Sequence, residues 1–326
     1  MHHRPPSTAL NLFIPSLHDS TPLETLLLVP SPVPTTSRKA AVIAHPYGPL
    51  GGSLNDAVVQ RLAAILLRRG YIVVLFNFRG VGHSRGHTSW TGSAERKDYA
   101  AVAAWALAFL VSLAGSSGEG EQQQQEEAHL LAAGYSYGAL IAAASSVHAQ
   151  YLLETLRSPP TPAYATALAA GIKSARCWGD VHSVAAARTS YSGVRSPQLP
   201  PPPPAEAQLQ ELRRWEEVAV RLSYLLVSPP LPPVSSLLLL GGGGRSVLDP
   251  VSAAEAGAGA AKKVFVAWGD DDVFTGVRKY RRWAEKMRSC EFVFEGVEVA
   301  GATHFWGEKA LGVVEERLGA WLEGEG

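Results

Sequence analysis

The stretch Tyr71-Ile-Val-Val-Leu-Phe76 restricts the fold more than any other part of the sequence. It is apolar at every position and has the length of a strand, so it predicts a strand that is buried on both faces. A strand of this kind belongs in a parallel sheet, because helices cover both faces of such a sheet. A helical pattern over residues 56–69 ends at Gly70, directly before this stretch. The sequence therefore predicts an α/β fold.

Segments with strand and helix patterns alternate along the rest of the chain. The other predicted strands cover residues 11–15, 23–29, 40–44, 129–133, 224–227, 264–268 and 292–294. The other predicted helices cover residues 95–113, 139–149, 206–220, 276–287 and 308–322. This alternation is typical of a doubly wound, mostly parallel sheet with helices on both faces.

Length and composition favour a single domain over residues 1–326. The chain has 326 residues, of which 46% are hydrophobic, and this is enough for one large core. Residues 150–218 contain proline-rich stretches, and we interpret them as an insertion or as a lid over a site. Residues 115–127 predict a solvated loop of low complexity. The glycines at 241–244 lack the following Lys-Ser/Thr of a phosphate-binding loop.

Charge and cysteine content argue against several classes of partner and location. The 29 basic and 29 acidic residues balance, and no basic stripe suggests nucleic acid or an anionic membrane. No apolar run approaches the ~20 residues that span a bilayer, and the first residues lack a secretory signal. The two cysteines, Cys177 and Cys290, do not make a disulfide framework. We expect a cytoplasmic protein, and the sequence leaves its oligomeric state open.

The pentapeptide Gly134-Tyr135-Ser136-Tyr137-Gly138 lies between a predicted strand and a predicted helix. A sharp strand-to-helix turn needs residues without bulk two positions on either side of its serine, which would then stand exposed at the start of the helix. There the backbone N–H of Tyr137 is free to bind a developing oxyanion. The alternative is an ordinary glycine-rich turn, but the placement favours Ser136 as a nucleophile.

An acid and a base follow Ser136 in the chain order that such a site requires. Asp272 lies in the loop after the predicted strand 264–268, and it is our candidate for the acid. Its neighbours Asp270 and Asp271 remain alternatives, interpreted first as loop caps or solvated charges. His304 precedes the last predicted helix and is the candidate base. In this arrangement Asp272 fixes the imidazole tautomer, and His304 accepts the Ser136 proton and returns it to the leaving group.

The loop over residues 45–52 follows an early predicted strand, where a second oxyanion donor is expected. The backbone N–H of Tyr47 is our candidate for that donor, and His45 is interpreted as orienting the loop through hydrogen bonds. Arg79 is expected to brace loops after the strand that ends at Phe76. Asp98 is placed near the start of a helix, where the helix dipole favours a negative charge.

Taken together, these motifs resemble one known family. They are His45-Pro46 with Gly51-Gly52-Ser53, residues 76–86, the pentapeptide around Ser136, Gly269-Asp270-Asp271-Asp272, and Gly301-Ala302-Thr303-His304-Phe305. The chain resembles the α/β-hydrolase superfamily, in particular the dienelactone-hydrolase-like serine hydrolases of bacteria and fungi. Dienelactone hydrolases themselves have cysteine where this chain has Ser136, so their activity is not carried over. Residues 150–218 match no part of that family.

The resemblance implies an enzyme that cleaves esters, thioesters or related acyl compounds of small molecules without a metal or an organic cofactor. Our leading hypothesis is a carboxylic-ester hydrolase that forms an acyl-enzyme on Ser136. One alternative is an acyltransferase or thioesterase of a biosynthetic, secondary-metabolite pathway, which would use the same three residues. A second alternative is a non-catalytic binding protein with this fold. The sequence does not define the substrate or its acyl chain length.

Overall fold

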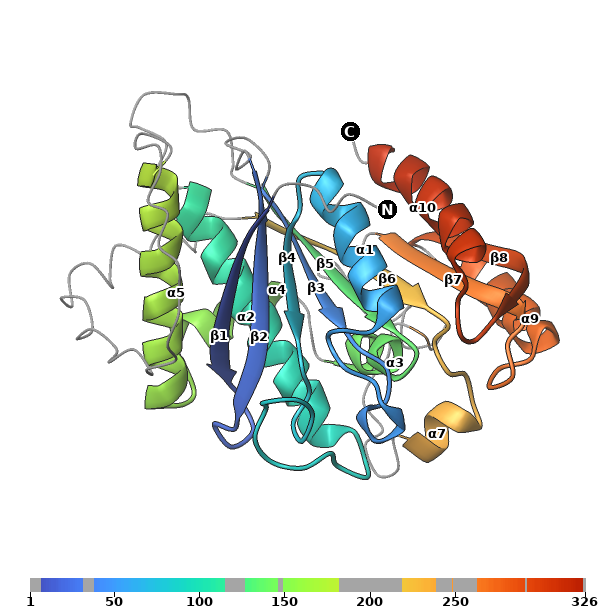
Figure 1. Cartoon of the computed structure of the whole chain (residues 1–326), viewed down its shortest axis with the longest axis horizontal. Coiled ribbons are helices and arrows are strands. Elements are labelled where there is room, and N and C mark those ends of the chain that lie inside the picture. Colours follow the sequence, from blue (N-terminus) through green and yellow to red (C-terminus); the bar gives the residue numbers. More distant parts are fainter. Residues whose placement is uncertain are drawn as a thin grey trace.

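One mixed sheet of eight strands forms the centre of the protein (Figure 1). The computed structural model describes residues 7–31, 38–114, 127–145, 149–181, 219–238, 248, 263–290 and 292–324. The strands are β1 (Ser7–Pro15), β2 (Pro22–Pro30), β3 (Lys39–Ala44), β4 (Ile72–Phe76), β5 (Glu127–Tyr135), β6 (Ala219–Val227), β7 (Lys263–Asp271) and β8 (Val293–Thr303). Their order in the sheet is β1-β2-β4-β3-β5-β6-β7-β8. The fold is therefore the doubly wound α/β architecture that the sequence predicts.

The apolar stretch before Asn77 forms β4, which lies inside the sheet between β2 and β3. All five of its residues are buried, as expected for a strand covered on both faces. β2 pairs with both β1 and β4 in antiparallel fashion, and the remaining neighbours from β4 to β8 are parallel. The carboxyl ends of β3 to β8 therefore meet at one edge, which is where ligands bind in open α/β sheets.

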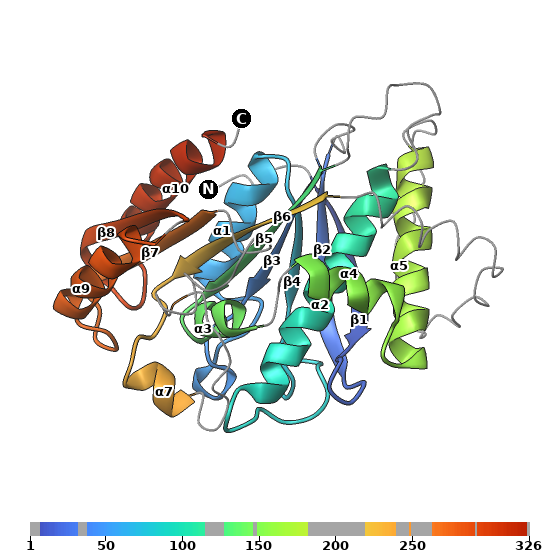
Figure 2. The same ribbon diagram turned by 180° about the vertical axis from the view of Figure 1, so that it is seen from behind.

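Helices cover both faces of the sheet. On the face nearer the viewer in Figure 1 lie α1 (Ala57–Arg68) and α10 (Glu308–Glu323), which share one apolar core with the sheet. The opposite face, seen in Figure 2, carries α2 (Ser93–Ala114), α3 (Tyr137–Ala144) and α9 (Val277–Arg288) over a second core. Asp56 caps α1 by accepting hydrogen bonds from the N–H groups of Val58 and Val59, and this explains the predicted start of that helix.

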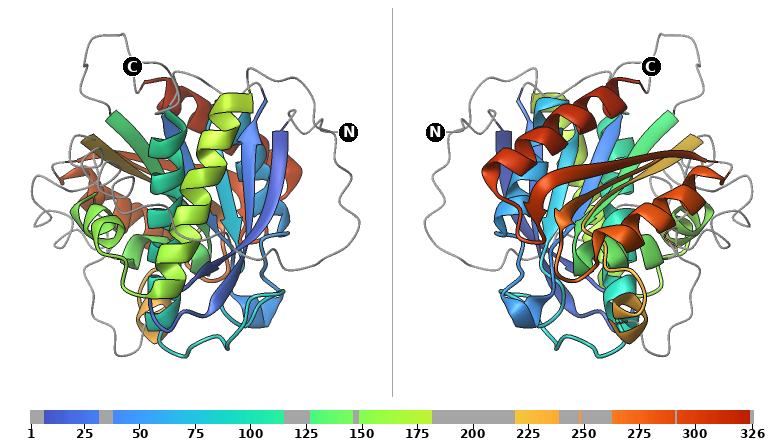
Figure 3. Two further views of the ribbon diagram at one scale, coloured as in Figure 1. Left: turned by 90° about the vertical axis from the view of Figure 1, so that its left-hand side faces the viewer. Right: turned by 90° about the vertical axis from the view of Figure 1, so that its right-hand side faces the viewer.

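The first half of the predicted insertion forms two further helices, α4 (Ala149–Arg157) and α5 (Pro162–Val181). Both pack against α2, and α5 also contacts β1 at the side of the molecule shown in the left view of Figure 3. Trp105 of α2 donates a hydrogen bond to the Ala167 carbonyl, and Tyr164 donates one to the Ala101 carbonyl. Residues 182–218, most of the predicted helix 206–220, the loop 115–126 and the glycines 241–244 lie outside the described residues. The interpretation of residues 150–218 as a lid or insertion stays a prediction.

Several predicted elements have different bounds in the structure. β1 begins at Ser7, before the predicted strand 11–15, and β6 begins at Ala219, so the predicted end of the helix 206–220 is wrong. The helix expected over residues 139–149 ends at Ala144, because Ser145 adopts an extended backbone conformation and α4 begins separately at Ala149. The strand expected over residues 292–294 continues as β8 to Thr303. Its glycines and charged residues are typical of a loop, yet the ladder with β7 satisfies their backbone groups on one side, and an edge strand tolerates polar residues on its open side.

The remaining described elements are short. They are the 3₁₀ helix η1 (Gly48–Leu50) and the helix α7 (Val234–Leu238). Within the described part of the chain, none of the helices combines the length and apolarity that a bilayer crossing requires.

Candidate active site

Ser136 occupies the turn between β5 and α3 at the carboxyl edge of the sheet. Its φ of 55° and ψ of −120° lie in a region that side chains rarely adopt, and such strain persists only where the surroundings impose it. The Ser136 N–H donates to the Val227 carbonyl at the end of β6, and the Ser136 carbonyl accepts from the N–H of Leu140 in α3. These bonds hold the turn from both sides. Ser136 itself is half-buried.

The two glycines of the pentapeptide are required by close backbone contacts. A Cβ on Gly134 would lie 2.3 Å from the carbonyl carbon of Gly138. A Cβ on Gly138 would lie 2.4 Å from the carbonyl oxygen of Ala44 at the end of β3. No side chain fits at such distances, because the atoms in contact belong to the backbone. The spacing of the motif thus follows from the packing of α3 against β3 and β5.

The structure brings Ser136, His304 and Asp272 together. His304 Nε2 lies 2.8 Å from Ser136 Oγ, and His304 Nδ1 lies 2.8 Å from Asp272 Oδ2. A carboxylate only accepts hydrogen bonds, so Nδ1 carries the proton and Nε2 is left as an acceptor for the serine hydroxyl. This tautomer is the one that a general base beside Ser136 needs.

Backbone groups fix the acid and the base in these positions. Asp272 Oδ1 accepts hydrogen bonds from the N–H groups of Phe274, at 2.9 Å, and Thr275, at 3.1 Å. Burial disfavours the Asp272 carboxylate, but the hydrogen bond from His304 and these two backbone bonds outweigh it and lower its pKa. The hydroxyl of Tyr135 donates to the His304 carbonyl at 2.7 Å. Asp272 and His304 are both buried.

The neighbouring acids face elsewhere. Asp270 Oδ1 accepts a hydrogen bond from the N–H of Gly301 at 2.7 Å and so ties the end of β7 to β8. Asp271 is exposed and lies opposite Thr303 in the β7–β8 ladder. Among these three acids Asp272 is the one that contacts His304.

The loop after β3 lies beside the start of α3. His45 Nδ1 donates to the Pro46 carbonyl at 2.6 Å, and His45 Nε2 accepts from the N–H of Phe78 at 3.0 Å. Burial lowers the pKa of His45 to about 4, so the ring is neutral and joins the loops after β3 and β4. The Tyr47 ring packs edge-on against the Tyr137 ring, with centroids 5.1 Å apart. The residues predicted to supply the two oxyanion donors are thus neighbours.

Comparison with known proteins finds one matching family model and several solved structures with a similar fold. The family model of X-Pro dipeptidyl-peptidase (S15 family) matches residues 19–170, a segment that contains Ser136. A solved structure from Xanthomonas campestris, a member of the α/β serine hydrolases without a lid, is 19% identical, with a TM-score of 0.51 over 98% of both chains. A structure of unknown function from Agrobacterium tumefaciens is 18% identical, with a TM-score of 0.54 over 97% of this chain and 98% of that one.

The esterase 2 of Thermogutta terrifontis, solved after phosphoramylation by tabun, gives a TM-score of 0.53 at 14% identity over 100% of this chain and 97% of that one. The chain has the α/β-hydrolase fold. By sequence, it is 32% identical over 102 residues to the uncharacterized protein RP471 of Rickettsia prowazekii. That match covers 31% of this chain and 37% of the Rickettsia protein.

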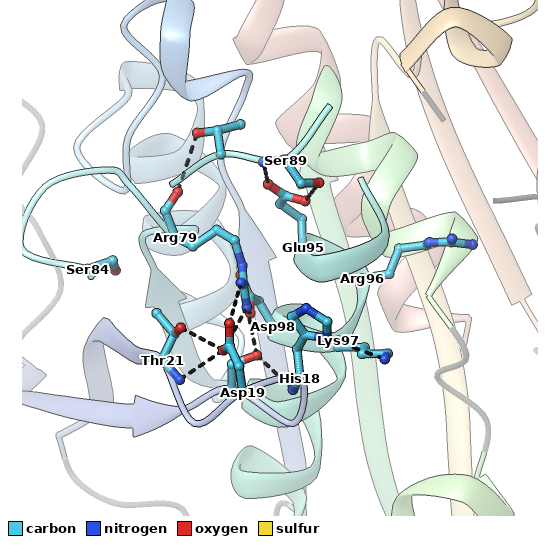
Figure 4. Close-up of polar contacts among 12 residues, drawn as sticks. His18, Asp19, Thr21, Arg79, Ser84, Ser89, Glu95, Arg96, Lys97 and Asp98 are labelled. Carbon is cyan, nitrogen blue, oxygen red and sulfur yellow. Dashed lines mark hydrogen bonds and ion pairs between the residues drawn. The ribbon is translucent and has the colours of Figure 1, made fainter. Parts of the chain in front are cut away.

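Arg79 joins the loop after β4 to the loop between β1 and β2 and to α2 (Figure 4). Its guanidinium donates to both oxygens of Asp98, at 2.8 and 2.6 Å, and to both oxygens of Asp19, at 3.0 and 3.3 Å. Arg79 also donates to Ser16 Oγ. Burial alone would lower the pKa of Arg79, but these bonds raise it. The bracing role predicted for Arg79 agrees with this geometry.

The prediction that the helix dipole favours a negative charge at Asp98 is wrong, because Asp98 lies beyond the first turn of α2, in which Glu95 is the acidic residue. Asp98 is fully buried in α2 and binds Arg79 in bidentate fashion. Glu95, one turn earlier, is also fully buried and accepts hydrogen bonds from the N–H and the hydroxyl of Ser89 (Figure 4). The two acids therefore anchor the loop over residues 79–92 at the edge of the sheet that carries Ser136.

Several residues around the site were not predicted from the sequence. Tyr135 anchors the His304 backbone, and Trp306 Nε1 donates to Ser228 Oγ at 3.0 Å, which fixes the loop after His304 to the end of β6. Phe274 contacts the His304 ring edge-on, with centroids 4.5 Å apart. Each lies within two residues of a predicted site residue or strand end, and that closeness was the signal available.

Among the described residues no group of His, Cys, Asp and Glu is arranged to hold a metal ion.

Proposed function

We propose that the protein is a serine hydrolase that cleaves a carboxylic ester through an acyl-enzyme on Ser136. The observation that carries the proposal is the continuous hydrogen-bonded chain from Ser136 through His304 to Asp272. A serine hydroxyl is a weak nucleophile unless a base takes its proton. Here the base lies within hydrogen-bond distance, and a buried carboxylate holds it in the required tautomer.

In the proposed reaction His304 Nε2 takes the proton from Ser136 Oγ while the oxygen attacks the ester carbonyl. The negative charge on the carbonyl oxygen is bound by the backbone N–H of Tyr137, the first residue of α3, and we assign the second bond to the N–H of Tyr47. The first amides of a helix have no carbonyl partner within it, and this leaves Tyr137 available. Protonated His304 then returns the proton to the leaving oxygen, and water repeats the sequence on the acyl-enzyme.

The decisive experiment combines a covalent probe with turnover. We expect a fluorophosphonate to label Ser136, because an esterase with this fold forms a phosphorus adduct with tabun. We also expect hydrolysis of p-nitrophenyl acetate, and Ser136→Ala should abolish both signals while circular dichroism shows a folded protein. Ser53→Ala is the matched control, because it also removes a serine hydroxyl from a nearby loop. Among the described contacts, that hydroxyl accepts one local hydrogen bond, from the N–H of Asn55. Persistent turnover in folded Ser136→Ala would refute the assignment.

A second candidate is cleavage of a peptide after an Xaa-Pro pair, which the match to the X-Pro dipeptidyl-peptidase family favours. The same three residues would attack an amide in place of an ester. Release of p-nitroaniline from Ala-Pro-p-nitroanilide, at a higher kcat/KM than p-nitrophenyl acetate gives, would support the peptidase; the reverse order would support the esterase.

Acyl transfer to an acceptor besides water, thioester cleavage and binding without catalysis give different results in further assays. Product analysis with an added alcohol, amine or thiol separates hydrolysis from acyl transfer, and acyl-thioester substrates test for a thioesterase. A folded protein that neither turns over these compounds nor reacts with the probe would be a binding protein with this fold.

A further inference from the structure

Two exposed phenylalanines flank His304 at the carboxyl edge of the sheet. Phe274 follows Asp272 by two residues, and its ring meets the imidazole edge-on at 4.5 Å between centroids. Phe305 directly follows His304, and its ring lies 5.7 Å from the imidazole and 6.4 Å from the Phe274 ring. Phe274 is 40% exposed and Phe305 is 72% exposed. We call this pair the aromatic rim.

The rim differs from the other aromatic contact of His304. Tyr135 also packs on the imidazole, at 5.7 Å, but it is buried and its hydroxyl is hydrogen-bonded to the His304 carbonyl. The buried side of the imidazole is therefore already packed by Tyr135. The rim covers another part of the ring and leaves two phenyl groups in contact with solvent. Single exposed apolar residues are common, but a pair that shares one functional histidine indicates a site for an apolar ligand.

The direction of proton transfer decides which part of a substrate meets the rim. His304 must give its proton to the leaving oxygen, so the alcohol part of an ester lies against the imidazole. The carbonyl oxygen points instead toward the N–H of Tyr137 at the start of α3. Side chains that contact the imidazole and face solvent are thus next to the alcohol. Val273, which directly precedes Phe274 in the same loop, is also exposed, at 75%.

We propose that Phe274 and Phe305 bind the alcohol part of the substrate, and that this alcohol is an apolar group such as an aryl or benzyl unit. The inference rests on the proposed esterase function and names the substrate class of that site. During acylation the Ser136 Oγ–carbonyl bond forms and the carbonyl–alcohol oxygen bond breaks, while the proton passes from Oγ through His304 to the departing alcohol. The alcohol is absent from the acyl-enzyme, so the rim affects the choice of substrate in acylation.

The test compares esters that differ in one half only. Benzyl acetate and 2-methoxyethyl acetate share the acyl group, and their alcohols are close in acidity but differ in apolar surface. Benzyl acetate and benzyl hexanoate share the alcohol and differ in the acyl group. For the wild type we expect a higher kcat/KM with benzyl acetate than with 2-methoxyethyl acetate. In Phe274→Ala/Phe305→Ala that ratio should fall by about tenfold, as expected when a phenyl group loses its apolar contacts.

Phe274→Leu and Phe13→Ala complete the design. Phe274→Leu keeps an apolar side chain and should retain most of the preference for benzyl acetate. Phe13→Ala removes a phenylalanine that is 54% exposed on β1, at the opposite end of the sheet order from β8, and it should leave both ratios unchanged. The hexanoate-to-acetate ratio should stay the same in all variants.

The outcomes separate the two proposals. Turnover with an unchanged alcohol ratio in the double variant would overturn the inference and leave the esterase intact. A change in the acyl ratio without a change in the alcohol ratio would place the rim on the acyl side and also overturn it. A wild-type protein that hydrolyses none of the three esters and escapes the fluorophosphonate would overturn the proposed function, and the inference with it.

Discussion

At the scale of single residues, hydrogen bonds distinguish one acid from its two neighbours. Asp270, Asp271 and Asp272 are consecutive and chemically identical, yet only Asp272 turns back to accept two backbone N–H groups and one imidazole N–H. Those three donors stabilise the charged carboxylate despite its burial. A carboxylate so held is suited to orient His304 and to stabilise the imidazolium.

Replacement of Asp272 by Asn should lower kcat for p-nitrophenyl acetate by about 10⁴-fold, because an amide neither stabilises the imidazolium nor enforces the tautomer. Asp271→Asn is the matched control, since Asp271 is exposed and lies outside this hydrogen-bonded chain. Steady-state kinetics on both variants, with circular dichroism to show folding, makes the comparison. Equal loss in the two variants would contradict the role given to Asp272.

The sequence selected Ser136, Asp272 and His304, which the structure brings within hydrogen-bond distance of one another, because each is tied to the end of a predicted strand and the three occur in a recognisable order. It did not identify Tyr135, Ser228 or the contact of Phe274 with His304. These depend on side chains that meet across strands far apart in sequence. Only the register and twist of the sheet determine such contacts, and neither follows from local patterns.

At the scale of elements, buried apolar runs and capped helices were predicted well, and edge elements less well. β4 is an uninterrupted apolar run, and α1 has a clear helical spacing of apolar residues with a capping residue before it and a glycine after it. The length of β8 depends on pairing with β7, and the end of α3 at Ala144 depends on Ser145, whose hydroxyl bonds back to the Ile141 carbonyl. Tertiary pairing thus outweighs local propensity at these boundaries.

Two Gly→Ala substitutions should change the free energy of unfolding in opposite directions, because one of the two glycines packs against backbone atoms and the other faces open space. Gly138→Ala should destabilise the protein by at least about 3 kcal/mol, because the new methyl overlaps the Ala44 and His45 carbonyls. Gly312→Ala, in the middle of α10, meets nothing within 4 Å and should stabilise the protein by about 0.5–1 kcal/mol. Urea unfolding measures both. A tolerated Gly138→Ala would show that the turn can move away from β3.

We expect the buried ion pair of Arg79 with Asp98 to contribute strongly to the free energy of unfolding, and the exposed pair of Arg281 with Glu298 to contribute little. Arg79→Met leaves the fully buried Asp98 carboxylate without its guanidinium, and this should lower the free energy of unfolding by about 3 kcal/mol or more. Arg281→Met breaks a solvent-exposed pair with Glu298 and should leave it unchanged within error. Urea unfolding of the two variants makes the comparison. Recovery in Arg79→Met/Asp98→Leu would show that the loss comes from the uncompensated charge.

At the scale of the whole molecule, two buried histidines link folding to pH. His45 lies at the carboxyl edge of the sheet, and His129 lies near the amino end of β5, where it contacts the Tyr71 hydroxyl and Ser223 Oγ. Burial lowers the pKa of His45 to about 4. Burial, together with the nearby charges of Arg221, Lys39 and Lys263, lowers the pKa of His129 to about 3. In the unfolded chain both titrate near 6.5.

At pH values between the folded and unfolded pKa, these histidines are therefore protonated in the unfolded state and neutral in the folded state. The contribution of each histidine is fully present above pH 6.5 and is lost as the pH falls toward the folded pKa. Between about pH 7.5 and about pH 4.5 each histidine contributes a loss of about 2–3 kcal/mol. His129→Gln keeps the capacity to bond Tyr71 and Ser223 but does not titrate, and it is remote from Ser136. We expect the free energy of unfolding of this variant, measured in urea, to fall by about 2–3 kcal/mol less than that of the wild type over that interval. An identical pH dependence of the two proteins would mean that His129 gains its proton in the folded state at the same pH as in the unfolded state. The three basic side chains near His129 argue against that outcome.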